Sequence, residues 1–200
     1  MTLSLLVHSF DGYAHLWPGY YKAFRENWNL EGYKCYFGSD IPTENTVGPP
    51  FKMLSSGPGE WSDRLRRLLE QIPSDYVLYM QEDHWPTQKP PDLAELCRIV
   101  MKYGLFRLQI SPKASFYTLD GMVFEPNSKY LVSHQPSIWR KSFLMDCLKS
   151  GETPWVNEYR GTLRLQQTSQ MREYIAGKIA IYPYEWYRHM CIKGKAVEVG

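Results

Sequence analysis

The sequence has few cysteines, no long apolar stretch and almost no excess of charge of either sign. Its four cysteines stand far apart and form no CxxC pair, which argues against a zinc knuckle and favours free thiols. No apolar run approaches the roughly 20 residues that a membrane-spanning helix needs. A net charge of +2 gives no strong electrostatic case for nucleic-acid binding and does not exclude it.

The first residues also lack the features of a secretion signal. The segment MTLSLLVHSFDG has no basic part before its apolar residues and becomes polar after Val7. Together with the isolated cysteines, this leads us to expect a cytoplasmic protein without a membrane span.

The composition is that of a globular protein. Hydrophobic residues make up 44% of the 200 residues and charged residues 22%, so we expect one domain covering 1–200. Aromatic residues are abundant at 15%, with 15 tyrosines and 7 tryptophans. They favour ring-lined sites for sugars, bases or nucleotides, and a large core would explain them equally well.

Strand-like and helix-like segments alternate along the chain. The expected strands are 3–7, 34–37, 76–80, 105–110 and 178–182. The expected helices begin at Pro18 and Asp92 or cover 61–72, 140–149 and 157–176. Residues 8–16 and the proline- and glycine-rich 41–60 are expected to be loops, and 130–139 to be extended. This alternation predicts an α/β fold with a mostly parallel sheet sandwiched by helices, in which ligands bind beyond the carboxyl ends of the strands.

Two adjacent carboxylates, Glu82 and Asp83, follow the predicted strand at 76–80. Such a pair is unfavourable unless a cation or hydrogen-bond donors neutralise it. A divalent ion completed by phosphate oxygens is one solution, because Mg²⁺ and Mn²⁺ prefer oxygen ligands. Solvated loop carboxylates are the alternative, and the spacing alone does not decide between the two.

Three segments in order resemble the GT-A type of nucleotide-sugar glycosyltransferases, most closely small bacterial and phage enzymes of the capsular-polysaccharide type. They are HSFDGYAHLWPGYYKAF, WSDRLRRLLEQIPSDYVLYMQEDHW and HQPSIWRKSFLMDCLKSGETPW. The resemblance implies a GT-A-like (Rossmann-like) fold with a nucleotide-sugar half at about 1–110 and an acceptor half at about 111–200. In that family a strand-end acidic motif, a variant of DxD, holds Mn²⁺ or Mg²⁺ against the donor diphosphate. Here it reads Gln81-Glu82-Asp83, which implies Asp83 as the metal ligand and Glu82 near the ribose or donor sugar.

The resemblance also implies nucleotide contacts. The loop after the first strand would cradle the nucleoside with Ser9, Asp11 and Tyr13, although an Asp-Gly turn explains the same residues. Asp63 and Arg64 open the helix at 61–72, whose N-terminus favours anions, and an arginine there suits a phosphate or base edge. A solvated helix face is the alternative reading.

The resemblance assigns further roles near the C-terminus. His189 would complete the metal site, since a neutral imidazole is a reasonable ligand for Mn²⁺, although a lone histidine there is usually just solvated. Arg188 and Lys193 would neutralise the leaving diphosphate or form an ordinary basic surface.

Inverting glycosyl transfer needs a general base that takes the proton of the acceptor hydroxyl. In the family this is an acidic residue at the start of a helix in the second half, which implies Glu158, with Glu152 as the nearest rival. First-turn stabilisation of the helix dipole would also explain Glu158. Trp155 would stack against the sugar or acceptor.

The predicted function is therefore metal-dependent glycosyl transfer with inversion at the anomeric carbon. The expected donor is a nucleotide sugar, with a UDP-sugar favoured, and the expected acceptor is a hydroxyl of a surface glycan. One alternative acceptor is a hydroxymethylated pyrimidine in DNA, which the pI of about 8.3 and the scattered basic and aromatic residues permit. Another alternative is a non-catalytic sugar- or nucleotide-binding module, which the missing first Asp of the acidic motif supports.

Overall fold

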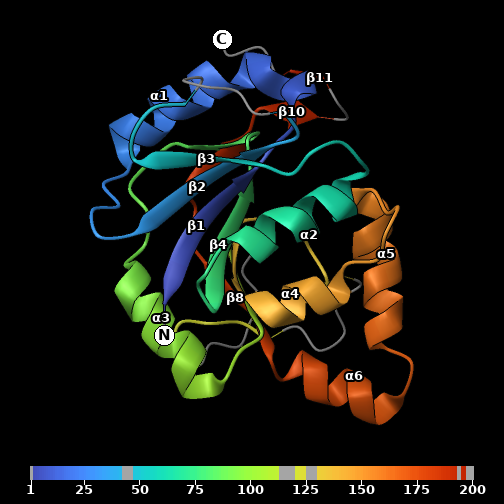
Figure 1. The fold of residues 1–200 in the computed structure, drawn as a ribbon. Coiled ribbons are helices and arrows are strands. Elements are labelled where there is room, and N and C mark those ends of the chain that lie inside the picture. The colour runs from blue at the N-terminus through green and yellow to red at the C-terminus, as the bar shows by residue number, and fades with distance from the viewer. Residues whose placement is uncertain (1, 42–46, 113–119, 125–129, 193–194, 197–200) are drawn as a thin grey trace.

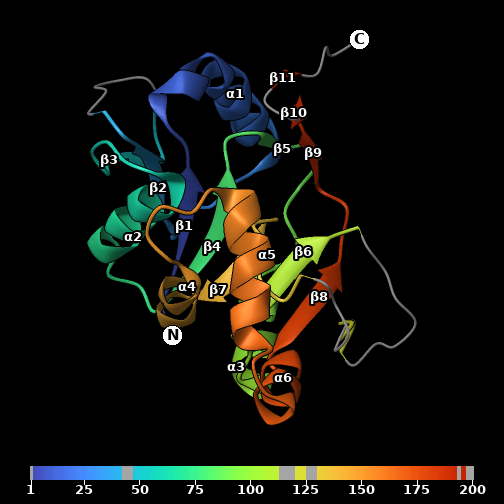
Figure 2. The same ribbon diagram turned by 90° about the vertical axis from the view of Figure 1, so that its right-hand side faces the viewer.

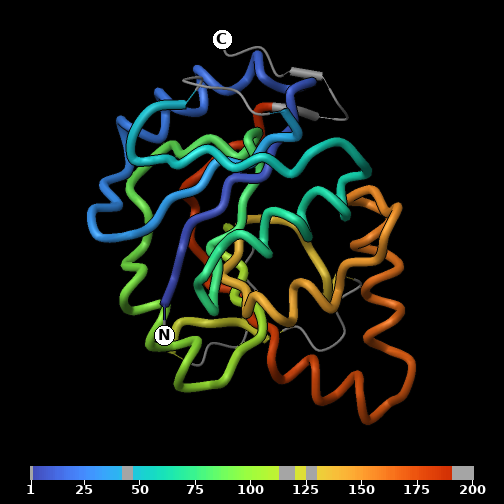
Figure 3. Tube along the Cα trace, viewed as in Figure 1, coloured from blue at the N-terminus to red at the C-terminus, as the bar shows by residue number. Residues whose placement is uncertain are grey.

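The structure, a computed structural model, describes residues 2–41, 47–112, 120–124, 130–192 and 195–196. Its centre is a seven-stranded sheet in the order β3-β2-β1-β4-β7-β6-β8, with helices on both faces (Figure 1). The strands of this sheet are β1 (Leu3–His8), β2 (Lys34–Ser39), β3 (Phe51–Ser55), β4 (Tyr76–Gln81), β6 (Arg107–Ser111), β7 (Ser137–Arg140) and β8 (Ile179–Pro183). Figure 3 shows the N-terminal strand, in blue, in the middle of the sheet.

Helices and two small ribbons complete the described structure. The helices are η1 (Asp11–Leu16), α1 (Trp17–Asn27), α2 (Trp61–Gln71), α3 (Leu93–Tyr103), α4 (Lys141–Cys147), α5 (Pro154–Leu165) and α6 (Ser169–Ala176). The ribbons pair β5 (His84–Pro86) with β9 (Tyr187–His189) and β10 (Cys191–Ile192) with β11 (Lys195–Ala196). None of the helices in the described ranges has the length and apolar character needed to cross a bilayer.

The sheet is mostly parallel, as predicted. β1 pairs in parallel with β2 and β4, β2 with β3, and β6 with β8. The exception is β7, which lies antiparallel between β4 and β6. Because its direction is reversed, its first residue, Ser137, lies opposite Tyr79 near the carboxyl end of β4. The segment before β7 therefore reaches the edge where ligands are expected.

Two hydrophobic cores hold the layers together. Successive strand side chains point to opposite faces, so Leu5 and Val7 of β1 enter one core and Leu6 enters the other. α1 and α3 contribute to the first core, and α2, α4 and α6 to the second (Figure 2). The helices on both faces confirm the predicted sandwich.

Some expected boundaries were wrong. Residues 51–55, expected in a loop, form β3, because they add a parallel strand to the edge of the sheet beside β2. Residues 11–16, also expected in a loop, form the 3-10 helix η1. The single helix expected at 157–176 is two: α5 starts earlier, capped by Thr153, and Thr168 caps α6.

Candidate active site

A cavity of about 380 Å³ opens at the carboxyl ends of β1 and β4, where the strand order predicted a site. Its walls come from the end of β1 and the following turn, the start of α2 and the turn between β4 and β5. The segment before β7, the start of α5 and His189 complete them. Residues far apart in the sequence thus meet at one sheet edge, and several of them are titratable.

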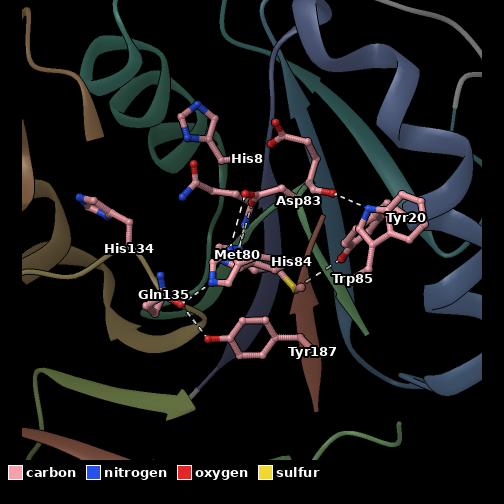
Figure 4. Close-up of polar contacts among 12 residues, drawn as sticks. His8, Tyr20, Met80, Asp83, His84, Trp85, His134, Gln135 and Tyr187 are labelled. Carbon is pink, nitrogen blue, oxygen red and sulfur yellow. Dashed lines mark hydrogen bonds and ion pairs between the residues drawn. The ribbon is translucent and has the colours of Figure 1, made fainter. Parts of the chain in front are cut away.

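The turn after β4 and the β9 strand form a candidate metal centre. β5 and β9 pair so that His84 lies opposite His189. His189 Nδ1 lies 3.7 Å from Asp83 Oδ2, and His84 Nδ1 lies 3.6 Å from Asp83 Oδ1. Ligand atoms of these three side chains lie within 4.8 Å of one another. Figure 4 shows Asp83 and His84 together at this strand end.

Asp83 and His189 are better candidate ligands than His84. The backbone N–H of Gln81 donates to His84 Nδ1 at 3.0 Å, which occupies that lone pair. Burial lowers the pKa of His84 to about 4, so its ring is neutral and carries its proton on Nε2. Asp83 Oδ1, by contrast, is buried and accepts no hydrogen bond from any described residue. A carboxylate beside an imidazole fits Mn²⁺ or Mg²⁺ with positions left for phosphate or water.

Glu82 lines the cavity but carries no full charge at neutral pH. Its side chain is buried, and burial together with the charge of Asp83 raises its pKa to about 8. A largely protonated Glu82 beside an ionised Asp83 removes most of the repulsion that two adjacent carboxylates would suffer. Trp85 Nε1 donates to the Glu82 carbonyl at 3.1 Å and fixes the turn.

Arg64 supplies a positive charge in the cavity wall. The side chain is buried, and its Nε and Nη1 atoms have no hydrogen-bond partner among the described residues. The guanidinium lies 4.6 Å from the centre of the Phe10 ring. Burial lowers the pKa of Arg64, yet a guanidinium remains protonated at neutral pH. Buried cationic donors without partners suit a bound anion.

Glu158 presents a carboxylate to the cavity from α5. Its Oε1 accepts from the His134 backbone N–H at 2.6 Å, and burial raises the pKa of this carboxyl above its usual value. A raised pKa brings a carboxylate closer to the range useful for a general base at neutral pH. The rival Glu152 does not line the cavity: it is buried in a two-point ion pair with Arg164, at 2.7 and 2.9 Å.

The predicted nucleoside loop only partly faces the cavity. Ser9 and Tyr13 line it, and Ser9 Oγ accepts from Trp17 Nε1 at 2.7 Å. Asp11 does not line the cavity, because its carboxylate accepts from the Ser39 hydroxyl behind the loop. A nucleotide contact by any of these residues stays a prediction.

Of the four other residues that the sequence predicted for the site, one lies at the cavity rim and two lie outside the cavity. Trp155 stands at the cavity rim with 68% of its surface exposed. Asp63 does not line the cavity; its Oδ2 accepts from the Gly151 N–H at 3.1 Å. Arg188 is exposed between two residues of β9 that face the other way, so it too lies outside the cavity wall. Lys193 lies outside the described residues.

Two buried histidines are among the cavity residues to which the sequence analysis gave no role. His8 and His134 both line the cavity, and the centre of the Trp61 ring lies 5.6 Å from that of His8 and 4.3 Å from that of His134. Burial lowers the pKa of His8 well below its usual value and that of His134 to about 3, so both rings are neutral. His134 and Gln135 precede β7, and the reversed direction of that strand brings them here.

Comparison with known proteins supports the fold. No model of a protein family matches the sequence, and no curated protein matches it. S. aureus TarS 1–349 in complex with UDP-GlcNAc has a TM-score of 0.55 at 16% identity, over 98% of this chain and 60% of that one. The mannosyltransferase PcManGT from Pyrobaculum calidifontis, in complex with GDP-Man and Mn²⁺, has a TM-score of 0.58 at 9% identity, over 96% and 58%. A CMP:2-keto-3-deoxy-manno-octonic acid synthetase complexed with CTP has a TM-score of 0.50 at 14% identity, over 92% and 90%.

The fold is that of the GT-A-type glycosyltransferases. This confirms the predicted GT-A-like architecture. The chain spans between 36% and 60% of the length of the TarS and PcManGT chains that it matches. At these identities the similarity shows the fold, so the activity has to be inferred from the side chains of the cavity.

The neutral buried histidines predict a specific acid sensitivity. The unfolded chain protonates histidine below about pH 6.5, whereas the folded protein keeps His134 neutral down to about pH 3. The stability that this depressed pKa contributes is therefore present above about pH 6.5 and lost as the pH falls towards 3. Metal-free His134→Gln should show a slope of unfolding free energy against pH that is lower by up to about 1.4 kcal/mol per pH unit between pH 6 and 4.

Denaturant melts in EDTA at several pH values measure this slope. Exposed His15→Gln is the control for the loss of one imidazole from the chain, and the slope of His134→Gln is compared with it. An identical slope in His134→Gln and the wild type would show that His134 is charged in the folded state.

Proposed function

We propose that the protein is a metal-dependent glycosyltransferase that moves a sugar from a nucleotide sugar, a UDP-sugar in the first place, to a hydroxyl group of a glycan. The observation that supports this most is the content of one cavity. It holds a candidate metal pair, Asp83 and His189, together with a partly buried carboxylate, Glu158, at the carboxyl ends of the strands.

The donor would lie across the end of β4. Asp83 and His189 would hold Mn²⁺ or Mg²⁺, and such an ion, when bound, neutralises charge on a diphosphate leaving group. Arg64 adds a second positive charge, and its Nε and Nη1 donors have no hydrogen-bond partner among the described residues. The rings of Phe10 and Tyr13 offer faces for a base. TarS with UDP-GlcNAc and PcManGT with GDP-Man and Mn²⁺ support a nucleotide-sugar donor on this fold.

Glu158 would act on the acceptor. Its carboxylate takes the proton of the acceptor hydroxyl while that oxygen forms a bond to the anomeric carbon of the donor sugar. The bond from this carbon to the diphosphate oxygen breaks, and its electron pair leaves with the nucleoside diphosphate. Attack from the face opposite the leaving group inverts the configuration. Trp155, three residues earlier on α5, offers the acceptor a ring at the cavity rim.

The experiment compares Asp83→Asn and Glu158→Gln with the wild type. Glu158→Gln should bind Mn²⁺ and UDP-sugar as the wild type does but lower kcat at least about 100-fold, because the amide cannot accept the proton. Asp83→Asn should lose the Mn²⁺-dependent part of nucleotide binding, because the metal pair loses its charged oxygen ligand. Calorimetry with UDP and UDP-GlcNAc measures binding, and release of UDP measures turnover.

Exposed Glu173→Gln on α6 is the matched control and should change neither nucleotide binding nor turnover. Full transfer activity in Glu158→Gln would refute the assignment of Glu158 as the general base.

Glycans and duplex DNA carrying hydroxymethylated cytosine serve as parallel acceptors, and the one that accepts sugar identifies the acceptor class. Release of pyrophosphate from CTP, in place of UDP from a UDP-sugar, would instead indicate nucleotidyl transfer, the other chemistry suggested by a neighbour on this fold.

A further inference from the structure

Gln135 contacts the candidate metal centre from a different part of the chain. It lies two residues before β7, whereas the centre is built by the β5–β9 ribbon. Its Oε1 atom lies 2.7 Å from the Tyr187 hydroxyl and 3.0 Å from His189 Nε2. Tyr187 and His189 both reach it because alternate residues of a strand point to the same side. Figure 4 shows Gln135 between the Tyr187 hydroxyl and the Asp83–His84 strand end.

Hydrogen-bond counting favours one orientation of the Gln135 amide. If Oε1 faces both neighbours, its two lone pairs accept the Tyr187 hydroxyl proton and the His189 Nε2 proton. If the NH₂ group faced them instead, the proton of the largely buried Tyr187 hydroxyl would have no acceptor among the described residues. A buried hydroxyl without an acceptor is unfavourable, because the hydrogen bond that it gave to water is not replaced.

The geometry at Asp83 agrees with this orientation. With the proton on Nε2, the lone pair of His189 lies on Nδ1 and faces Asp83. The Nδ1–Oδ2 distance of 3.7 Å is too long for a hydrogen bond. It falls at the upper end of the roughly 3.0–3.7 Å that separates two ligands of one Mg²⁺- or Mn²⁺-sized ion at angles of about 90–120°. The two atoms are thus spaced as two ligands would be, and not as a donor and its acceptor.

The backbone alone does not fix the orientation or the tautomer of the His189 ring. The β5–β9 ladder fixes the main chain, and the Met190 N–H adds a bond to the Asp83 carbonyl at 2.8 Å. These bonds leave the imidazole free to turn and to exchange tautomers, and 40% of the side chain is exposed. The carboxylate of Asp83 would by itself favour a proton on Nδ1, which would block metal binding. An acceptor opposite Nε2 reverses that preference.

We propose that Gln135 is a positioning residue of the metal centre: by accepting the Nε2 proton of His189, it holds the ring with the Nδ1 lone pair directed at the ion, and Tyr187 holds Gln135 in place. This inference rests on the proposed function for the identity of the ion. It concerns the readiness of the site before any substrate binds, so it is testable without turnover.

The first measurement is the tautomer of His189 in the metal-free wild type, read from long-range ¹H–¹⁵N correlations of ¹⁵N-histidine-labelled protein. The His189 signals are assigned by comparison with His189→Asn. We expect the proton on Nε2. A proton on Nδ1 would overturn the proposal, and this result needs no variant that could misfold.

The second measurement is Mn²⁺ affinity by electron paramagnetic resonance without nucleotide. Gln135→Met keeps the size of the side chain but removes the acceptor. It should bind Mn²⁺ about 10- to 100-fold more weakly and shift the His189 proton towards Nδ1. Gln135→Glu keeps an acceptor and should bind at least as tightly as the wild type. Tyr187→Phe keeps Gln135 but removes its second partner, and should weaken binding by less than Gln135→Met does.

The outcomes separate this inference from the proposed function. The positioning role would be overturned if Gln135→Met bound Mn²⁺ with wild-type affinity, or if Gln135→Glu bound Mn²⁺ more weakly than Gln135→Met. Either result would leave the proposed glycosyl transfer intact. A wild type that binds Mn²⁺ with the expected variant effects but releases no nucleotide from any nucleotide sugar would retain the role of Gln135 and refute the proposed function.

Discussion

The pairing of β5 with β9 is the interaction on which the candidate site depends. It brings His189 to Asp83, more than a hundred positions earlier in the chain, through a ladder of three residues on each strand. Two-stranded ribbons of this length are marginal in water. Here the ribbon is anchored by Trp186, which is fully buried, stacks on Trp28 with ring centres 4.7 Å apart and donates to the Ile110 carbonyl at 3.1 Å. The hydrophobic core therefore holds the strand that carries the candidate ligand.

The cavity is rich in titratable groups but poor in charge. His8, His84 and His134 are neutral because they are buried, and Glu82 is largely protonated for the same reason. The remaining charge is concentrated on a few groups, chiefly Asp83 and Arg64. Because the surroundings have a low dielectric constant, each of these charges acts more strongly on a ligand than it would in water. A divalent ion and a diphosphate would then meet few competing charges.

The sequence predicted the parts of the site that follow directly from strand order. Asp83 closes an apolar strand, and parallel strands place such ends at one sheet edge. Glu158 and His189 came from the resemblance, and both line the cavity, although their roles are untested. His134 and Gln135 were missed because nothing in the residues before β7 indicates that this strand runs antiparallel between β4 and β6. Strand direction depends on tertiary pairing, which a local pattern does not encode.

Asp63 was expected to contact the nucleotide, but in the structure its side chain connects two segments of the protein. Its carboxylate and the neighbouring Ser62 bind the loop that leads into α5: Gly151 N–H donates to Asp63 Oδ2, and Ser62 and Glu152 exchange two bonds at 3.0 and 3.1 Å. α2 carries Arg64 and α5 carries Glu158, so these bonds connect the two helices at the ends that line the cavity. The proposed donor-binding charge of Arg64 and the proposed base Glu158 would thereby be held at a fixed separation. The proposed transfer between two bound substrates would need such rigidity, because reacting groups have to be held close to their productive geometry.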